Sequence, residues 1–190
     1  PIEPEPFRRD THSTLLNFSL SIDFLAKVVP REYLGRDRTP VARLALTRPM
    51  AFSNIEASQL LVYKDDLDKA RWTPEMWEEI RCNLANLQNR LQANGYTFFV
   101  ALVATDKLSA YSDWLEDQRL ARLSRYDLLA ADPGLHLPRV DLALKAAVRN
   151  NVLDVYLNND THWGANGYAL VARELTEYLV RAGVLAPVVR

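Results

Sequence analysis

Cysteine is nearly absent from the sequence, since Cys82 is the one cysteine among 190 residues. A single thiol excludes an internal disulfide framework and a zinc site built from several cysteines. Long apolar runs are also missing, because none approaches the roughly 18–20 residues that a transmembrane helix needs. We therefore expect this chain to be soluble and to make no membrane contact itself, which leaves room for a membrane anchor elsewhere in a parent protein.

Neither sign of charge is in excess, because 23 Lys and Arg residues face 24 Asp and Glu residues and leave a net charge of −1. This balance argues against a protein that binds nucleic acid through bulk positive charge. The hydrophobic content of 48% excludes a disordered chain. The length suits one α/β domain with a proper core. We expect a single domain over residues 1–190, with an irregular part over 1–50 and an α/β core over 51–190.

The first fifty residues are rich in proline and begin at Pro1 without a methionine or a signal peptide. We therefore expect a cropped or processed piece of a longer protein, whose targeting cannot be read directly. Between the prolines, residues 13–29 are apolar enough for one helix, which Pro30 would end. Residues 41–46 fit a strand or a short helix equally well.

The pattern sharpens after residue 59. Thr73 and Pro74 predict a helix start, and an apolar stripe then runs to the stop at Asn94 and Gly95, through Met76, Ile80, Leu84, Leu87 and Leu91. The continuous apolar run 98–103 is typical of a buried parallel strand.

A similar succession fills the second half of the chain. We predict helices over 114–130 and 141–148, a strand over 152–157, and a final helix whose stripe ends before Gly183; that stripe consists of Tyr168, Val171, Leu175 and Leu179. The alternation of strands and helices predicts a three-layer α/β/α sandwich with a mainly parallel sheet, incomplete at its N-terminus if this chain is a piece.

Asp160 and His162 follow the strand predicted over 152–157, where ligands of open α/β sheets bind. An aspartate two residues from a histidine can accept a hydrogen bond from one imidazole nitrogen and leave the other free to take a proton from a hydroxyl nucleophile. Trp163 would form a wall of that site, and Gly164 and Gly167 would let the chain turn into the helix. The alternative is a capping aspartate with a satisfied loop histidine.

The stretch from Tyr156 to Tyr168, with Asp160-Thr161-His162-Trp163 at its centre, resembles the closing block of SGNH hydrolases and most of all their alginate O-acetyltransferase (AlgJ/AlgX-type) branch. Asp106-Lys107 and Tyr111 extend the resemblance, which covers about residues 59–180. It implies an SGNH or flavodoxin-like fold. It also implies that His162 is the general base, that Asp160 orients it, and that the neighbouring side chains bind substrate: Trp163, Lys107 and Tyr111. A solvent-exposed lysine and a half-buried tyrosine are the plainer interpretation of the last two.

The resemblance further implies acyl transfer, or ester hydrolysis, at a hydroxyl of an exported polysaccharide or with an acylated small molecule. It implies a periplasmic or extracellular location and requires no metal or organic cofactor.

The sequence departs from this family in its serines. The family needs a nucleophilic serine in a Gly-Asp-Ser or Gly-Thr-Ser turn, and none of the eight serines has that context or follows Asp160: Ser13, Ser19, Ser21, Ser53, Ser58, Ser109, Ser112 and Ser124. Ser53-Asn54 is the nearest polar pair. Two explanations fit: the nucleophile lies in sequence outside this chain, which the start at Pro1 favours, or the domain has kept the fold and lost catalysis.

Three rival hypotheses remain at this point. The tripeptide Asp-Thr-His occurs at residues 10–12 as well as 160–162, so the two copies offer four ligands to a divalent cation. A non-catalytic carbohydrate-binding or assembly module would use tryptophan faces for stacking, from among Trp72, Trp77, Trp114 and Trp163. A thiol enzyme is disfavoured, because Cys82 lies in a predicted helix with no histidine near it in the sequence.

Overall fold

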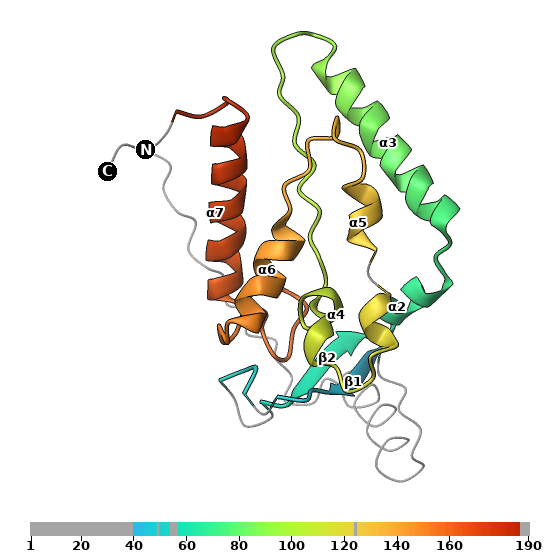
Figure 1. The fold of residues 1–190 in the computed structure, drawn as a ribbon, viewed down its shortest axis with the longest axis vertical. Helices are drawn as coiled ribbons and strands as arrows, with labels where there is room; N and C mark the ends of the chain where they lie inside the picture. Colours follow the sequence, from blue (N-terminus) through green and yellow to red (C-terminus); the bar gives the residue numbers. More distant parts are fainter. Residues whose placement is uncertain (1–39, 49, 54–56, 124, 187–190) are drawn as a thin grey trace, which may run out of the picture. The chain divides into compact units, whose positions relative to one another are not determined.

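The computed structural model describes residues 40–48, 50–53, 57–123 and 125–186 (Figure 1). The chain divides into two units, Pro1–Pro40 and Val41–Arg190, and the description below concerns the second. The helix predicted over 13–29 and the first Asp-Thr-His copy lie outside the described residues. The prediction of one domain over 1–190 stays a prediction.

A two-stranded antiparallel sheet begins the second unit. β1 (Val41–Ala45) pairs with β2 (Gln59–Tyr63), with Arg43 opposite Leu61. Residues 41–46 therefore contain a strand and not a helix. Leu60 and Val62 alternate with more exposed neighbours and are fully buried, which directs one face of β2 into the core.

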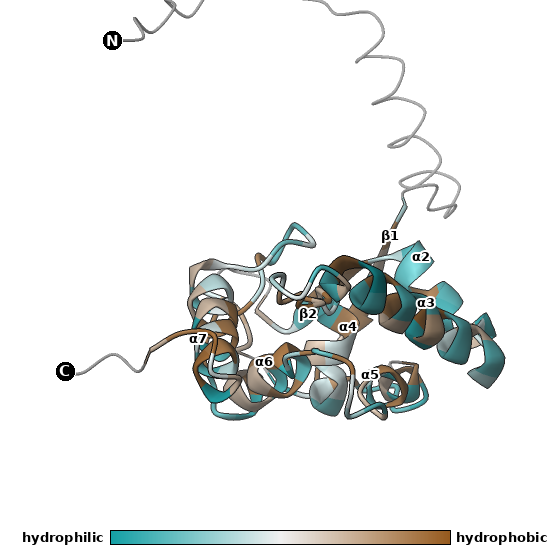
Figure 2. Cartoon of the chain, turned by 90° about the horizontal axis from the view of Figure 1, so that it is seen from above, coloured by the Kyte–Doolittle hydropathy of each residue, from teal (hydrophilic) through white to brown (hydrophobic). Residues whose placement is uncertain are grey.

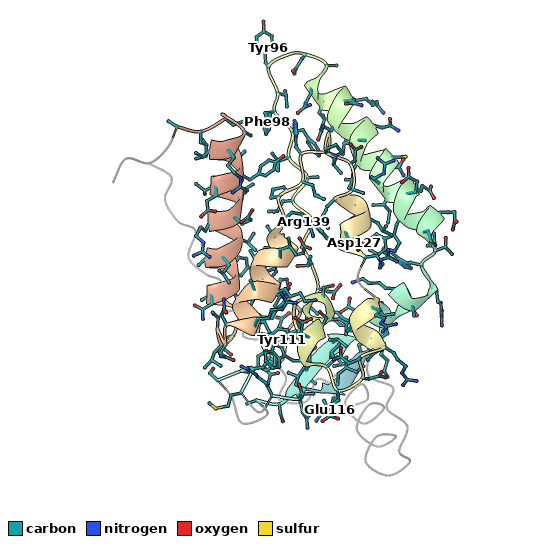
Figure 3. The ribbon with its side chains drawn as sticks, viewed as in Figure 1. Tyr96, Phe98, Tyr111, Glu116, Asp127 and Arg139 are labelled. Atoms are coloured by element: carbon teal, nitrogen blue, oxygen red, sulfur yellow. The ribbon has the colours of Figure 1, made fainter. Side chains whose placement is uncertain are left out.

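Helix α3 (Pro74–Gln92) begins as predicted, with the Thr73 hydroxyl accepting a bond from the Met76 amide at 3.4 Å. Gly95 follows it with a φ of 74°. The buried face differs from the predicted stripe, because Trp77 and Gln88 are buried while Met76, Leu87 and Leu91 are each more than 40% exposed. Figure 2 shows polar and apolar residues along the helix, and Tyr96 projects from the loop that follows it (Figure 3).

Neither of the two runs predicted as buried strands forms a ladder among the described residues. Residues 98–103 run beside the segment 135–138, through a bond from the Ala101 amide to the His136 carbonyl at 2.9 Å. Residues 152–157 turn at Leu153 and Asp154, the latter with a φ of 51°, and make one isolated bridge, between Tyr156 and Trp163. In the part of the chain that is described, the only sheet is β1–β2, so the parallel three-layer arrangement stays a prediction.

The single helix predicted over 114–130 is wrong. The segment instead contains short helical elements joined largely by turns and bends: η2 (Ser112–Trp114), η3 (Leu120–Arg122) and α5 (Tyr126–Leu129). Its start is drawn into an extended bridge between Leu46 and Leu115, and the Glu116 amide donates to the Ala45 carbonyl at 3.1 Å. These backbone bonds at the edge of β1 replace the first turns of a helix.

Helices α6 (Val140–Arg149) and α7 (Ala165–Arg181) pack side by side, close to their predicted bounds (Figure 1). Val140, Leu144 and Val171 from these helices join one hydrophobic core with Leu60 and Val155. Three short elements complete the unit: α2 (Lys64–Leu67), η1 (Asp68–Arg71) and α4 (Lys107–Ala110). No helix among the described residues is both long and apolar enough to span a bilayer.

Candidate active site

A short loop closed on itself carries Asp160 and His162. The Leu157 amide donates to the His162 carbonyl at 3.0 Å, and the Gly164 amide donates to the Val155 carbonyl at 3.0 Å. Val155 beneath the loop is fully buried. The loop therefore rises from a buried base and has a defined backbone, although the side chains of Asp160 and His162 are exposed.

His162 and Asp160 form the pair that the sequence suggested. Nδ1 of His162 lies 2.7 Å from Oδ1 of Asp160, and the same oxygen accepts bonds from the Thr161 and His162 amides at 2.6 and 3.2 Å. The bond from the imidazole, followed by that from the His162 amide, lowers the pKa of Asp160. An ionised carboxylate only accepts hydrogen bonds, so Nδ1 is the donor and Nε2 of the neutral ring is left to accept a proton.

Both members of this pair are accessible from solvent. The His162 side chain is 70% exposed and that of Asp160 is 47% exposed. A hollow of about 220 Å³ borders Asp160 on one side and strand β2 on the other, lined by Val41, Leu61, Val62, Tyr63, Asn159, Asp160 and Thr161. A ligand in this hollow would lie beside Asp160, while His162 is not part of its lining.

Lys107 does not lie in solvent, contrary to the plainer interpretation. Lys107 is 1% exposed. Its ammonium group donates to the carbonyls of Leu61 at 3.1 Å and Asn158 at 2.7 Å. Burial lowers the pKa of Lys107 to about 8, against the attraction of Asp160 and Asp66. In this arrangement the ammonium group holds backbone next to the site and does not reach the surface as a substrate contact would.

Tyr111 is equally buried, with 1% of its surface exposed, and is not the half-buried side chain of the plainer interpretation (Figure 3). Its ring lies 5.2 Å from that of Phe52 and 6.2 Å from that of Tyr156. Burial raises the pKa of the hydroxyl, which has no hydrogen-bond partner among the described residues. The structure therefore places Tyr111 in the core under the loop.

Trp163 lies beside the pair as a half-buried side chain. Its ring packs edge-on against Tyr168 at 5.4 Å. Tyr168 was expected in the core stripe of α7, but it is 53% exposed and packs against Trp163 at the start of the helix.

Asp66 is a neighbour of the site that the sequence does not distinguish from Asp65 beside it. The two residues lie in α2, directly after β2. Burial raises the pKa of Asp66, against the attraction of Lys69 and Lys107. Its burial and the nearby charges of Lys69 and Lys107 distinguish Asp66 from its neighbour.

No described serine is hydrogen-bonded to His162. The Ser109 hydroxyl donates to Asp106 at 3.0 Å, and the Ser112 hydroxyl is buried without a partner among the described residues. The Ser53 amide donates to Oδ1 of Asp154 at 3.0 Å, which brings the segment before Asn54 against the base of the loop. The nucleophile is not identified in the described part of the chain.

A metal centre finds no support among the residues that the structure describes. They contain no group of three or more His, Cys, Asp or Glu side chains that could hold an ion. The second pair of ligands in the metal hypothesis, Asp10 and His12, lies outside them.

Comparison with protein families identifies a match that covers most of the chain. A family model described as SGNH hydrolase-like domain, acetyltransferase AlgX, matches residues 60–186. The match contains β2 from Leu60 onward, the Asp160–His162 loop, Lys107 and α7. No match was found among curated proteins or among solved structures.

Proposed function

The chain belongs to the SGNH hydrolase-like domains of the acetyltransferase AlgX family, and from this premise we propose that it serves acyl transfer, or ester hydrolysis, at a carbohydrate hydroxyl. The family implies an α/β fold and a polysaccharide substrate. One observation supports the reaction most directly: Nδ1 of an exposed His162 lies 2.7 Å from an ionised Asp160 inside the matched region.

In the proposed mechanism, His162 acts as general base through Nε2. It takes the proton of a serine hydroxyl, the serine oxygen bonds to the acyl carbon, and the donor's oxygen leaves with that proton. A sugar hydroxyl, or water in the hydrolytic case, then attacks the acyl-serine and restores the serine. Asp160 keeps the imidazole in the productive tautomer and stabilises its charged form.

The hollow beside Asp160 is the proposed place for the acyl acceptor. It faces the carboxylate and the backbone of β2, which offers polar groups to sugar hydroxyls. We propose that the apolar runs 98–103 and 152–157 correspond to strands of the parallel sheet of a three-layer sandwich. The proposed setting is the periplasm or the cell exterior, where an exported polysaccharide is modified.

Labelling with a fluorophosphonate, followed by intact-protein mass spectrometry, tests the proposal. His162→Ala is compared with His136→Ala, because Nδ1 of His136 contacts the Phe99 carbonyl at 2.9 Å and has no part in the site. An adduct that persists in His136→Ala and disappears in His162→Ala supports the mechanism, and peptide mapping names the serine. Equal labelling of both variants contradicts a general base at residue 162.

An adduct absent from this chain and present in the parent protein would place the serine outside these residues. If neither is labelled, a second candidate function gains support, that of a module that binds carbohydrate without turnover.

A second hollow, of about 210 Å³, favours that candidate. Trp72 and Trp77 line it with ring centroids 4.9 Å apart. Lys69, which is ion-paired with Asp106, and Ser109 supply polar groups at its wall. An indole face next to such groups suits a sugar ring, whose faces are apolar and whose edges are polar.

Titration of tryptophan fluorescence with soluble polysaccharide tests the binding module. Loss of binding in Trp72→Ala, with binding kept in Trp114→Ala, would support it. Trp114 is a suitable control because the Arg48 guanidinium covers its ring at 3.7 Å. Equal binding by the two variants would contradict a role for this hollow.

A further inference from the structure

The ammonium group of Lys107 connects two parts of the chain that flank the candidate site. It donates to Leu61 in the middle of β2 and to Asn158 at the start of the loop. Both acceptors are backbone carbonyls, so the contact fixes main chain in place and not a movable side chain. The ammonium group also lies over the Phe52 ring, with Nζ 5.6 Å from the ring centroid.

This contact acts directly on the geometry of the pair. Asn158 precedes Asp160 by two residues, and the bond between Leu157 and His162 closes the loop around them. A change in the position of the Asn158 carbonyl therefore moves the backbone that carries both side chains. Strand β2 is held in place by its pairing with β1 along its whole length, so it provides a fixed anchor for the other bond of Lys107.

Packing alone does not explain a lysine at this position. Burial of an ammonium group is unfavourable unless hydrogen bonds and opposite charges compensate it. A methionine would fill similar space without that penalty. The compensation comes from Leu61, from the loop, and from the charges that act on Lys107: Asp66 of α2 and Asp160 of the site itself.

We propose that Lys107 is a positioning residue, whose ammonium group fixes the loop against β2 and so maintains the hydrogen bond between Nδ1 of His162 and Asp160. This role rests on the proposed function for its catalytic meaning. The geometric effect itself needs neither a nucleophile nor a substrate, and it can be measured separately.

The test is the tautomer of His162, observed by long-range ¹H–¹⁵N NMR of the imidazole in the full chain near pH 7.5. In the wild-type protein the Nδ1–H tautomer should predominate. In Lys107→Met its fraction should fall at least twofold. Lys145→Met is the matched control, because Lys145 makes an ion pair with Asp113 at 2.9 Å away from the site, and it should leave the tautomer unchanged.

A folded Lys107→Met protein with an unchanged tautomer would overturn the proposal. If that variant does not fold, the proposal is tested by an NMR pH titration of the wild-type protein. The Asn158 carbonyl and the His162 ring nitrogens should then shift together with the titration of Lys107. His162 signals that stay constant across that step would equally overturn it.

The two proposals fail separately. Loss of labelling in His162→Ala with an unaffected tautomer in Lys107→Met would reject only the positioning role. A tautomer that depends on Lys107 in a protein that transfers no acyl group would reject only the proposed activity.

Discussion

Gly164 lies against the backbone of Asp154 so closely that a β-carbon on it would be 2.1 Å from the Asp154 carbonyl oxygen. Gly167 has the same relationship to the Val155 carbonyl, also at 2.1 Å. Neither glycine has a positive φ, so close approach and not a special turn requires them. The two contacts bring the first turn of α7 onto the chain that leads into the loop of Asp160 and His162.

Gly164→Ala should destabilise the protein by about 1–3 kcal/mol, because the methyl group meets rigid backbone. The free energy of unfolding in urea measures this. Gly134→Ala is the control, since its β-carbon would lie 3.3 Å from a side-chain oxygen of Asp132 and not against backbone, and it should change stability much less. Equal stability of both variants would show that α7 can move away from Asp154.

The pKa of Asp160 should depend on His162. The carboxyl group titrates below its ordinary value of 3.8, mainly because the imidazole donates to it. In His162→Ala the midpoint of a carboxyl ¹³C titration should therefore rise. His136→Ala should leave it unchanged. A midpoint that is the same in all three proteins would mean that the pair does not form in solution.

Lys107 should make stability depend on pH in the alkaline range. Its folded pKa of about 8 lies below the ordinary 10.5, so between these values the unfolded chain binds more protons and stability rises with pH. Relative to Lys107→Met, the wild-type protein should gain roughly 2 kcal/mol between pH 7.5 and 10. Urea unfolding at several pH values measures the difference. A constant difference would show that Lys107 is not buried as an ammonium group.

Features that depend on near neighbours in the chain were predicted from the sequence. The cap at Thr73, the stops at Gly95 and Gly183, and the pairing of Asp160 with His162 each involve residues within a few positions of one another. Turn chemistry and the geometry of an Asp-x-His loop settle such features locally.

Features that depend on distant partners were not predicted. Lys107 finds its acceptors about fifty residues away on either side, and nothing in its own surroundings marks it as buried. The helix expected over 114–130 is interrupted because Leu115 bridges to Leu46. Apolar content alone also cannot distinguish a strand with neighbours from an extended run such as 98–103, because the difference lies in what pairs with it.

Cys82 should react slowly with alkylating reagents although it is exposed. Its thiol lies 3.4 Å from a Glu78 carboxylate oxygen, and this hydrogen bond raises the pKa of the thiol. A catalytic cysteine requires the opposite shift. Glu78→Gln should accelerate reaction with iodoacetamide at pH 7.5, as followed by mass spectrometry, while Glu79→Gln should not. Fast alkylation of the wild-type protein would contradict the arrangement.

Gln88 and Leu87 test which face of α3 is buried, because the apolar stripe predicts Leu87 in the core whereas the structure buries Gln88 at 5% exposure. The Gln88 amide donates to the Gly134 carbonyl and accepts from the His136 amide, both at 2.7 Å. Gln88→Leu would leave both backbone groups without this partner and should cost about 2–4 kcal/mol.

Leu87→Ala should change stability by less than about 1 kcal/mol, since the side chain is 45% exposed. Urea denaturation of the two variants measures both values. The reverse order, with Leu87→Ala the more damaging, would return α3 to the orientation that the stripe predicts. In that orientation, Gln88 could not form the two bonds that hold the segment 134–136 beside the extended run 98–103.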